Sequence, residues 1–152
     1  MTPVLILKIR RLHPEKDRDL AIPEYMSPQA SGLDLPAAVE ADLTLNPGEI
    51  RLIPTGLALA IPPGFEGQIR PRSGLALKHG LTLINSPGTI DSDYRGEIGL
   101  AMVNLGSKPY TIRRGDRLAQ LVIHKVYQAE IRLVEELEST DRADGGFGHS
   151  GM

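Results

Sequence analysis

The sequence contains no cysteine and no tryptophan among its 152 residues, and it has only two phenylalanines and four tyrosines. Without cysteine the chain has no disulfide framework, no thiolate nucleophile and no cysteine-based zinc site. This composition fits a cytoplasmic protein, which is the location that we expect. The histidines do not predict a zinc site either, because they are scattered and no two of them have the spacing of paired metal ligands. They are His13, His79, His124 and His149.

An excess of charge of either sign is also missing. The 17 lysines and arginines nearly balance the 19 aspartates and glutamates, which gives a formal net charge of -2. Proteins that bind nucleic acids carry a basic excess to neutralise phosphates, so no nucleic-acid partner is expected. Any anionic ligand must therefore be held by a local group of side chains.

Long hydrophobic runs are absent as well. No apolar run approaches the ~20 residues that cross a bilayer, so no membrane partner is expected. The N-terminal run at 4–7 has only four apolar residues and no basic segment ahead of it. This pattern predicts a strand rather than a signal peptide.

The apolar residues that are present fall into short segments with a period of two. These segments are rich in leucine, isoleucine and valine, and turn residues such as Pro47 and Gly48 separate them. The pattern predicts an all-β fold, closed as a jelly-roll-like β-sandwich or barrel. The length fits one domain, assigned to residues 1–140 and followed by a tail at 141–152.

One short helix is expected within this β-rich domain. Ser73 is in position to cap its start, and Gly80 is in position to end it. The segment 128–140 fits either an amphipathic helix or a late strand. The alternation of apolar and charged residues around Ile131 favours the strand.

The C-terminal tail carries four glycines and almost no apolar residues. Such a segment buries too little surface to offset the entropy of ordering, so we predict that it is flexible. Gly146, Gly148 and Gly151 match the pattern G-x-G-x-x-G, but a dinucleotide site needs a strand before this pattern and a helix after it. The chain has no Walker-type phosphate loop.

Two polar groups point to an anion or a metal. Arg72 leads into Ser73, whose hydroxyl and following N–H groups at a helix start suit a phosphate. The alternative is a capped turn with solvated arginines. Asp34 lies between two leucines in a strand-like stretch, where a carboxylate must be paired, hydrogen-bonded or near a cation. A structural anchor is the alternative to a role beside a metal.

The stretch NSPGTIDSDYRG at 85–96 combines turn residues with acidic side chains. In a hairpin-like corner Asp91 points inward and Asp93 faces water, although a simple turn also favours these residue types. In a later strand, the spacing of Arg117 and Gln120 places them on opposite faces.

In their order along the chain, these segments resemble the five motifs of the trimeric dUTPase family. The resemblance covers nearly the whole chain outside residues 13–28. It rests on five segments: SGLDLPA at 31–37, PRSGLALKHG at 71–80, NSPGTIDSDYRGEI at 85–98, RRGDRLAQLVI at 113–123 and RADGGFGHSG at 142–151.

The resemblance implies a fold, an activity and a partner. Members are homotrimers of jelly-roll-like subunits that hydrolyse dUTP to dUMP and pyrophosphate with Mg²⁺, and each active site draws motifs from three chains. The implied role is to limit uracil incorporation into DNA and to supply dUMP for dTTP synthesis. The implied partners are dUTP and two further copies of this chain.

The family's third motif implies the residues that read the nucleoside and start the reaction. Asp91 is the implied catalytic residue, which activates the attacking water, and Tyr94 packs on the deoxyribose where it excludes a 2′-hydroxyl. The uracil is read by the side chain of Asn85 and the backbone after it: Gly88, Thr89 and Ile90.

The other motifs imply contacts to the phosphates, the metal and the base. Mg²⁺ is implied to bind mainly through the triphosphate of the substrate, with Asp34 acting on its waters. Arg142 is implied to bind the terminal phosphate, and Phe147 to cover the base, with Gly148 also in the substrate site. The remaining phosphate contacts come from Arg72, Ser73, Gly74 and Gln120.

Two other classes of protein are alternatives to this one. A dCTP deaminase is similar in fold, but that family needs a glutamate where this chain has Ala101, and Glu97 comes too early. A β-sandwich that binds nucleotides without turnover is the second alternative. The presence of Asp91, Arg72 and Phe147 together argues against it.

Overall fold

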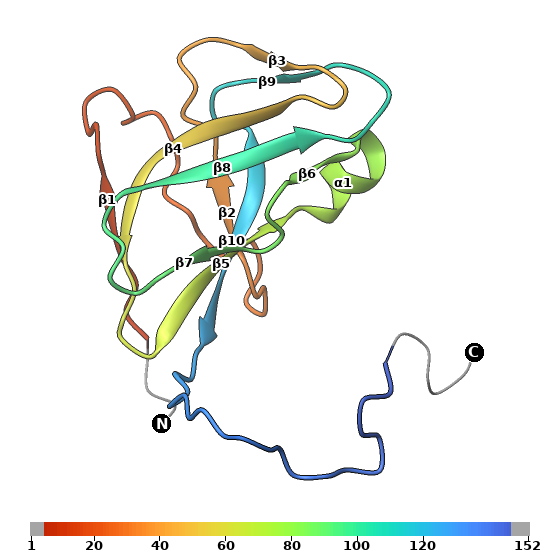
Figure 1. The fold of residues 1–152 in the computed structure, drawn as a ribbon. Helices are drawn as coiled ribbons and strands as arrows, with labels where there is room; N and C mark the ends of the chain where they lie inside the picture. The colour runs from red at the N-terminus through yellow and green to blue at the C-terminus, as the bar shows by residue number, and fades with distance from the viewer. Residues whose placement is uncertain (1–4, 147–152) are drawn as a thin grey trace.

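Two four-stranded antiparallel sheets and a two-stranded pair make up the fold of the computed structural model, which describes residues 5–146 (Figure 1). The first sheet has the strand order β1-β4-β8-β6, and the second has the order β2-β10-β5-β7. The elements are β1 (Lys8–Arg11), β2 (Leu33–Pro36), β3 (Leu43–Leu45), β4 (Ile50–Ala60), β5 (Phe65–Pro71), α1 (Ser73–His79), β6 (Leu81–Leu83), β7 (Gly88–Ile90), β8 (Glu97–Asn104), β9 (Tyr110–Ile112) and β10 (Arg117–Lys125).

The core forms because apolar residues alternate along the strands of both sheets. On β8, Ile98, Leu100 and Met102 are buried while the residues between them are more exposed. Fully burying one such side chain contributes about 1.5–3 kcal/mol. The large buried side chains come from both sheets and from the β3–β9 pair: Leu35, Leu45, Ile53, Leu81, Ile98, Leu100, Met102, Ile112, Leu118 and Leu121.

The expected fold class is therefore confirmed: an antiparallel jelly-roll-like β-fold with one short helix among the described residues. The strand expected around the N-terminal apolar run is found slightly later, as β1. None of the helices in the described part of the chain is long and apolar enough to cross a membrane.

The late strand expected at 128–140 is not formed. This segment has no regular secondary structure and runs away from the two sheets toward the C-terminus (Figure 1). Its apolar side chains are exposed, with Ile131 at 93% and Leu133 at 101%. The prediction failed because alternation alone does not make a strand, which also needs a neighbouring strand to pair with.

Candidate active site

The short helix α1 forms one wall of a polar hollow of about 360 Å³. The expected end of the helix is confirmed, because Gly80 adopts a left-handed conformation with φ of 69°. The expected cap is wrong: Arg72 is the capping residue, with extended backbone and no side-chain cap hydrogen bond, and Ser73 is the first helical residue. The hollow is lined by Asp34, Arg72, Ser73, Gly74, Leu75, Lys78, His79 and Gln120.

Two guanidinium groups converge on the carboxylate of Asp34 in this hollow. Arg117 donates to Asp34 Oδ2 at 3.1 Å, and Arg72 Nη2 lies 3.4 Å from the same oxygen. Arg72 is fixed further because its Nη1 donates to the backbone oxygen of Arg117 at 2.7 Å. Asp34 is thus both paired and oriented, as a carboxylate in a largely buried strand must be.

A β-bulge in β10 places Arg117 on the same face as Gln120, so the expected opposite faces are wrong. Arg117 pairs with Pro36 of β2, whereas Gln120 pairs with Asp34, and the register shifts between them. The extra residue of the bulge changes the parity of the strand. Both polar side chains therefore reach the side of the sheet that carries Asp34.

The side chain of Gln120 is held between two backbone segments. Its Nε2 donates to the backbone oxygen of Pro71 at 3.0 Å, and its other end lies directly against Gly32. A side chain at Gly32 would collide with it. The close approach of the Gly32 backbone therefore defines where the amide of Gln120 lies.

A second hollow, of about 320 Å³, lies where β7 leads into the turn before β8. In this turn the N–H of Tyr94 donates to the backbone oxygen of Asp91 at 3.1 Å. The Tyr94 hydroxyl donates to the backbone oxygen of Glu97 at 3.0 Å. Asp91 and Asp93 are both exposed, so the expected inward orientation of Asp91 into the protein is wrong. The hollow is lined by Leu52, Thr89, Ile90, Asp91, Tyr94, Glu97 and Gly99.

The remaining residues of the expected nucleoside site lie beside this second hollow. Asn85 is exposed in the loop between β6 and β7. Its side-chain amide lies beside Gly88, where a Cβ would come within 3.1 Å of Asn85 Nδ2. β7 itself pairs with β5, so its backbone is held at the edge of the second sheet.

The two hollows share no lining residue, so the chain by itself does not bring Asp34, Arg72 and Gln120 together with Asp91 and Tyr94. Arg142, expected to bind phosphate, instead donates from Nε to the backbone oxygen of Gly145 at 2.9 Å. Phe147 and Gly148 lie outside the described residues.

A metal site made of protein ligands alone is not present in residues 5–146, where no group of three or more histidine, aspartate or glutamate side chains is suitably placed. Asp34 offers one carboxylate beside the basic hollow. Mg²⁺ commonly binds through one or two carboxylates together with substrate phosphates. The residues present fit that mode of binding.

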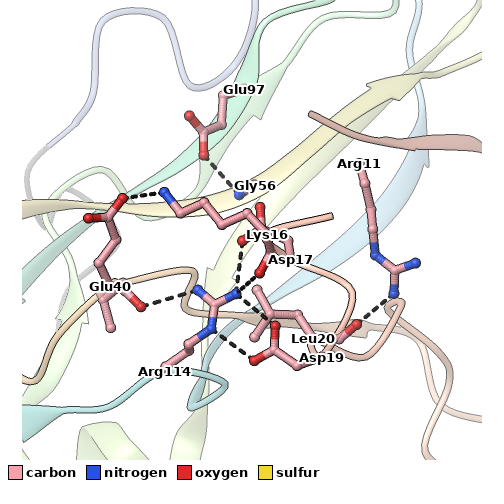
Figure 2. A network of polar contacts seen from close by, with 10 residues as sticks. Arg11, Lys16, Asp17, Asp19, Leu20, Glu40, Gly56, Glu97 and Arg114 are labelled. Carbon is pink, nitrogen blue, oxygen red and sulfur yellow. Dashed lines mark hydrogen bonds and ion pairs between the residues drawn. The ribbon is translucent and has the colours of Figure 1, made fainter. Parts of the chain in front are cut away.

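A polar network joins the loop after β1 to the turn before β10 (Figure 2). Arg114 donates to Asp17 Oδ1 at 2.9 Å and to Asp19 Oδ1 at 2.8 Å, which holds the loop after β1 against the turn before β10. The hydrogen bond from Arg114 lowers the pKa of the Asp19 carboxyl below its ordinary value. In the same region Glu97 Oε1 accepts the N–H of Gly56 at 2.8 Å.

Sequence reasoning missed Arg117 and Glu97 as residues of the site. Arg117 lies within one of the segments that carry the resemblance, but its role depends on the bulge, which has no clear signal in the sequence. Glu97 lies in the second hollow, yet its partner Gly56 is 41 residues away along the chain. Its contact is visible only in the folded protein.

The fold and the site define the class of protein: a jelly-roll-like β-protein with a hollow that carries basic residues beside its short helix and a separate acidic hollow at a hairpin. The family model named dUTPase matches residues 18–151. The chain therefore belongs to the dUTPase family, and it is a hydrolase.

Relatives and solved structures agree with this assignment. The deoxyuridine 5'-triphosphate nucleotidohydrolase of Caldanaerobacter subterraneus is 56% identical over 148 residues, which cover 97% of this chain and 99% of the relative. That of Desulfotalea psychrophila is 58% identical over 133 residues, covering 88% and 89% of the two chains.

Two solved structures of phage enzymes are also similar. A mutant dUTPase of Staphylococcus bacteriophage 80alpha with the nucleotide dUpNHpp has a TM-score of 0.85 and 28% identity, covering 97% of this chain and 99% of the phage chain. A mutant dUTPase of S. aureus phage phi11 has a TM-score of 0.77 and 29% identity, covering 88% and 99%, and its structure describes the coordination of a structural Mg(II) ion.

Proposed function

We propose that this dUTP-hydrolysing enzyme binds its substrate across the two hollows. The first hollow holds the triphosphate, and the second holds the nucleoside. The observation that carries the proposal is the grouping of the side chains. Asp34, Arg72, Ser73 and Gln120 line the first hollow, whereas Asp91 and its turn line the second.

In the nucleoside hollow, the uracil lies against the loop between β6 and β7. The amide of Asn85 and the backbone of Gly88, Thr89 and Ile90 supply the donors and acceptors that match its edge. The ring of Tyr94 is fixed by the hydrogen bond of its hydroxyl to Glu97. In the proposed arrangement this ring takes the space beside C2′ of the sugar. A 2′-hydroxyl would collide with this ring, so the sugar must be deoxyribose.

The chemical step is attack of water on the α-phosphorus, in line with the departing pyrophosphate. Asp91 takes the proton of the attacking water as a general base, which typically contributes about 10²- to 10⁴-fold. Arg72, Ser73, Gly74 and Gln120 hold the phosphates by hydrogen bonds. Positioning and neutralisation of charge supply most of the catalysis in reactions of this kind.

Asp34 is the residue that would help to hold Mg²⁺, which would bind mainly through the triphosphate of the substrate. Both guanidinium contacts of this carboxylate use Oδ2, so Oδ1 would remain available to hold the ion through one of its waters. When bound, Mg²⁺ supplies positive charge to the phosphate oxygens. Arg72 then contacts both the carboxylate of Asp34 and the phosphates, and so fixes their relative positions.

A homotrimer unites the two hollows, each active site taking them from different copies of the chain. Large apolar side chains exposed in the single chain support an assembled form. They lie on β4, directly after β6, in the loop after β8 and along the segment after β10: Ile50, Leu52, Ile84, Leu105, Ile131, Leu133, Val134 and Leu137.

The tail at 141–152 acts as a lid over the bound nucleotide. Arg142 exchanges its bond to Gly145 for a charge-assisted bond to phosphate, and Phe147 stacks on the uracil, with Gly148 beside it. Closure excludes bulk water and completes the site. A cytoplasmic location, where the dUTP pool is used, remains part of the proposal.

The proposal is tested with a panel of nucleoside triphosphates, in which pyrophosphate and ammonia are measured separately. We expect pyrophosphate from dUTP, almost none from UTP or dTTP, and no ammonia from dCTP. Release of ammonia would support the deaminase alternative. Tight binding of dUTP without product would support a binding protein.

A further inference from the structure

Glu97 closes an interruption in the pairing of β4 with β8. The register of the two strands shifts between Pro54 and Ala58, so the backbone of Gly56 faces no backbone partner on β8. The carboxylate of Glu97 takes the place of that partner, with its Oε1 accepting the N–H of Gly56 at 2.8 Å (Figure 2).

The Gly56 N–H depends on this contact because Gly56 is buried. A buried backbone donor without a partner is strongly unfavourable. The local shape is also fixed from the other side. Gly56 has φ of 68°, and a side chain there would collide with Asp17 Oδ2. Asp17 is itself held by Arg114 at 2.9 Å.

The same Glu97 carries the acceptor that orients Tyr94. Its backbone oxygen receives the Tyr94 hydroxyl at 3.0 Å, and the ring lies across Gly96, where any side chain would collide with it. The carboxylate and the carbonyl of one residue therefore connect Gly56 of β4 with Tyr94 of the site.

We propose that Glu97 is a positioning residue for Tyr94, and that its bond to Gly56 fixes the start of β8 and so the place of the Tyr94 ring. Loss of this positioning should change the selection of deoxyribose over ribose, because Tyr94 lies beside C2′ in the proposed function on which this inference rests. A purely structural role of Glu97 would lower stability and leave sugar choice unchanged.

The test compares the ratio of kcat/KM for dUTP and UTP in Glu97→Ala and Glu97→Gln. Loss of the carboxylate should lower the preference for dUTP by about fivefold, which is the worth of one ordinary hydrogen bond. Glutamine keeps an oxygen that can accept the Gly56 N–H, so it should restore the parent ratio.

The matched control is Glu49→Ala. Glu49 also accepts a backbone N–H, from Asn46 at 2.9 Å, but it lies in the turn before β4 and lines neither hollow. Its removal should leave the ratio of the two substrates unchanged. An equal shift in this control would overturn the proposal, because the effect would then follow from general loosening.

Two measurements separate this inference from the proposed role of Tyr94. Tyr94→Ala tests whether the ring selects the sugar, and NMR of the Tyr94 ring, assigned with Tyr94→Phe, reports its placement directly. Shifted ring signals in Glu97→Ala but not in Glu97→Gln support the positioning role, even if Tyr94→Ala leaves the substrate ratio unchanged and the sugar role fails.

Unchanged ring signals in Glu97→Ala would overturn the inference. So would a Glu97→Gln variant that moves the ring as far as alanine does, because the charge would then matter rather than the hydrogen bond. If Tyr94→Ala changes the ratio while Glu97→Ala does not, the sugar role stands and the positioning role fails.

Discussion

A single methyl group added at Gly32 should slow dUTP hydrolysis by displacing Gln120. A Cβ at Gly32 would lie 3.1 Å from both Cβ and Cδ of Gln120 and would collide with its Oε1. The backbone of Gly32 lies outside the left-handed region, so alanine fits its conformation. The amide of Gln120 must therefore move, and it must give up its bond to Pro71 at 3.0 Å.

The size of the effect follows from the contact that is lost. A hydrogen bond from an amide to a charged phosphate is worth about 1.5–3 kcal/mol. Its loss should lower kcat/KM for dUTP by about 10- to 150-fold. The fold should be retained, because Gly32 lies outside the strands, directly before β2, and the group that moves is a flexible side chain.

The assay is pyrophosphate release by Gly32→Ala, Gln120→Ala and the double variant. If the methyl group acts through Gln120, the double variant should be no slower than Gln120→Ala alone. Independent effects, in which the double variant loses the product of the two single losses, would refute the reasoning. An unfolding midpoint equal to that of the parent confirms that the fold is intact.

Three further predictions concern stability and the tail. Asn104→Ala removes three hydrogen bonds of a fully buried side chain, so it should lower the free energy of unfolding by about 3 kcal/mol in urea titrations. The control Asn46→Ala, at an exposed position, should lower the free energy of unfolding by less than ~1 kcal/mol. Because Arg114 lowers the pKa of Asp19, the stability from this pair is complete above the ordinary carboxyl value of 3.8 and is lost as the pH falls through the lower folded value. Urea titrations from pH 5 to pH 2 (about the range where carboxylates titrate) should therefore show a smaller acid loss in Arg114→Met. Truncation after Thr140 should strongly lower kcat without changing the oligomeric state in light scattering; full activity would mean that the tail is no lid.

The sequence predicted the features that depend on local pattern. Alternating apolar residues gave the strands and the core, and Gly80 gave the end of α1. Asp34, Arg72 and Gln120, which the family resemblance assigns to the phosphates and the metal, line one hollow.

The predictions that were wrong or incomplete concern features that depend on contacts between distant segments of the chain. The bulge at Leu118 reverses the parity of β10, and it is set by the pairing with β2 rather than by the residues of β10 alone. The alternation around Ile131 predicted a strand, but no partner strand exists within the described chain. Glu97 was passed over because its partner Gly56 is distant in the sequence.

The central claim, that one active site takes its two hollows from different copies of the chain, is tested most directly by mixing two inactive variants. Arg72→Ala lacks the phosphate side, and Asp91→Asn lacks the base. After joint refolding in equal amounts, random assembly should give intact sites with about a quarter of the parent activity. If each site came from one chain, the mixture would stay as inactive as the separate variants, and the account would be contradicted.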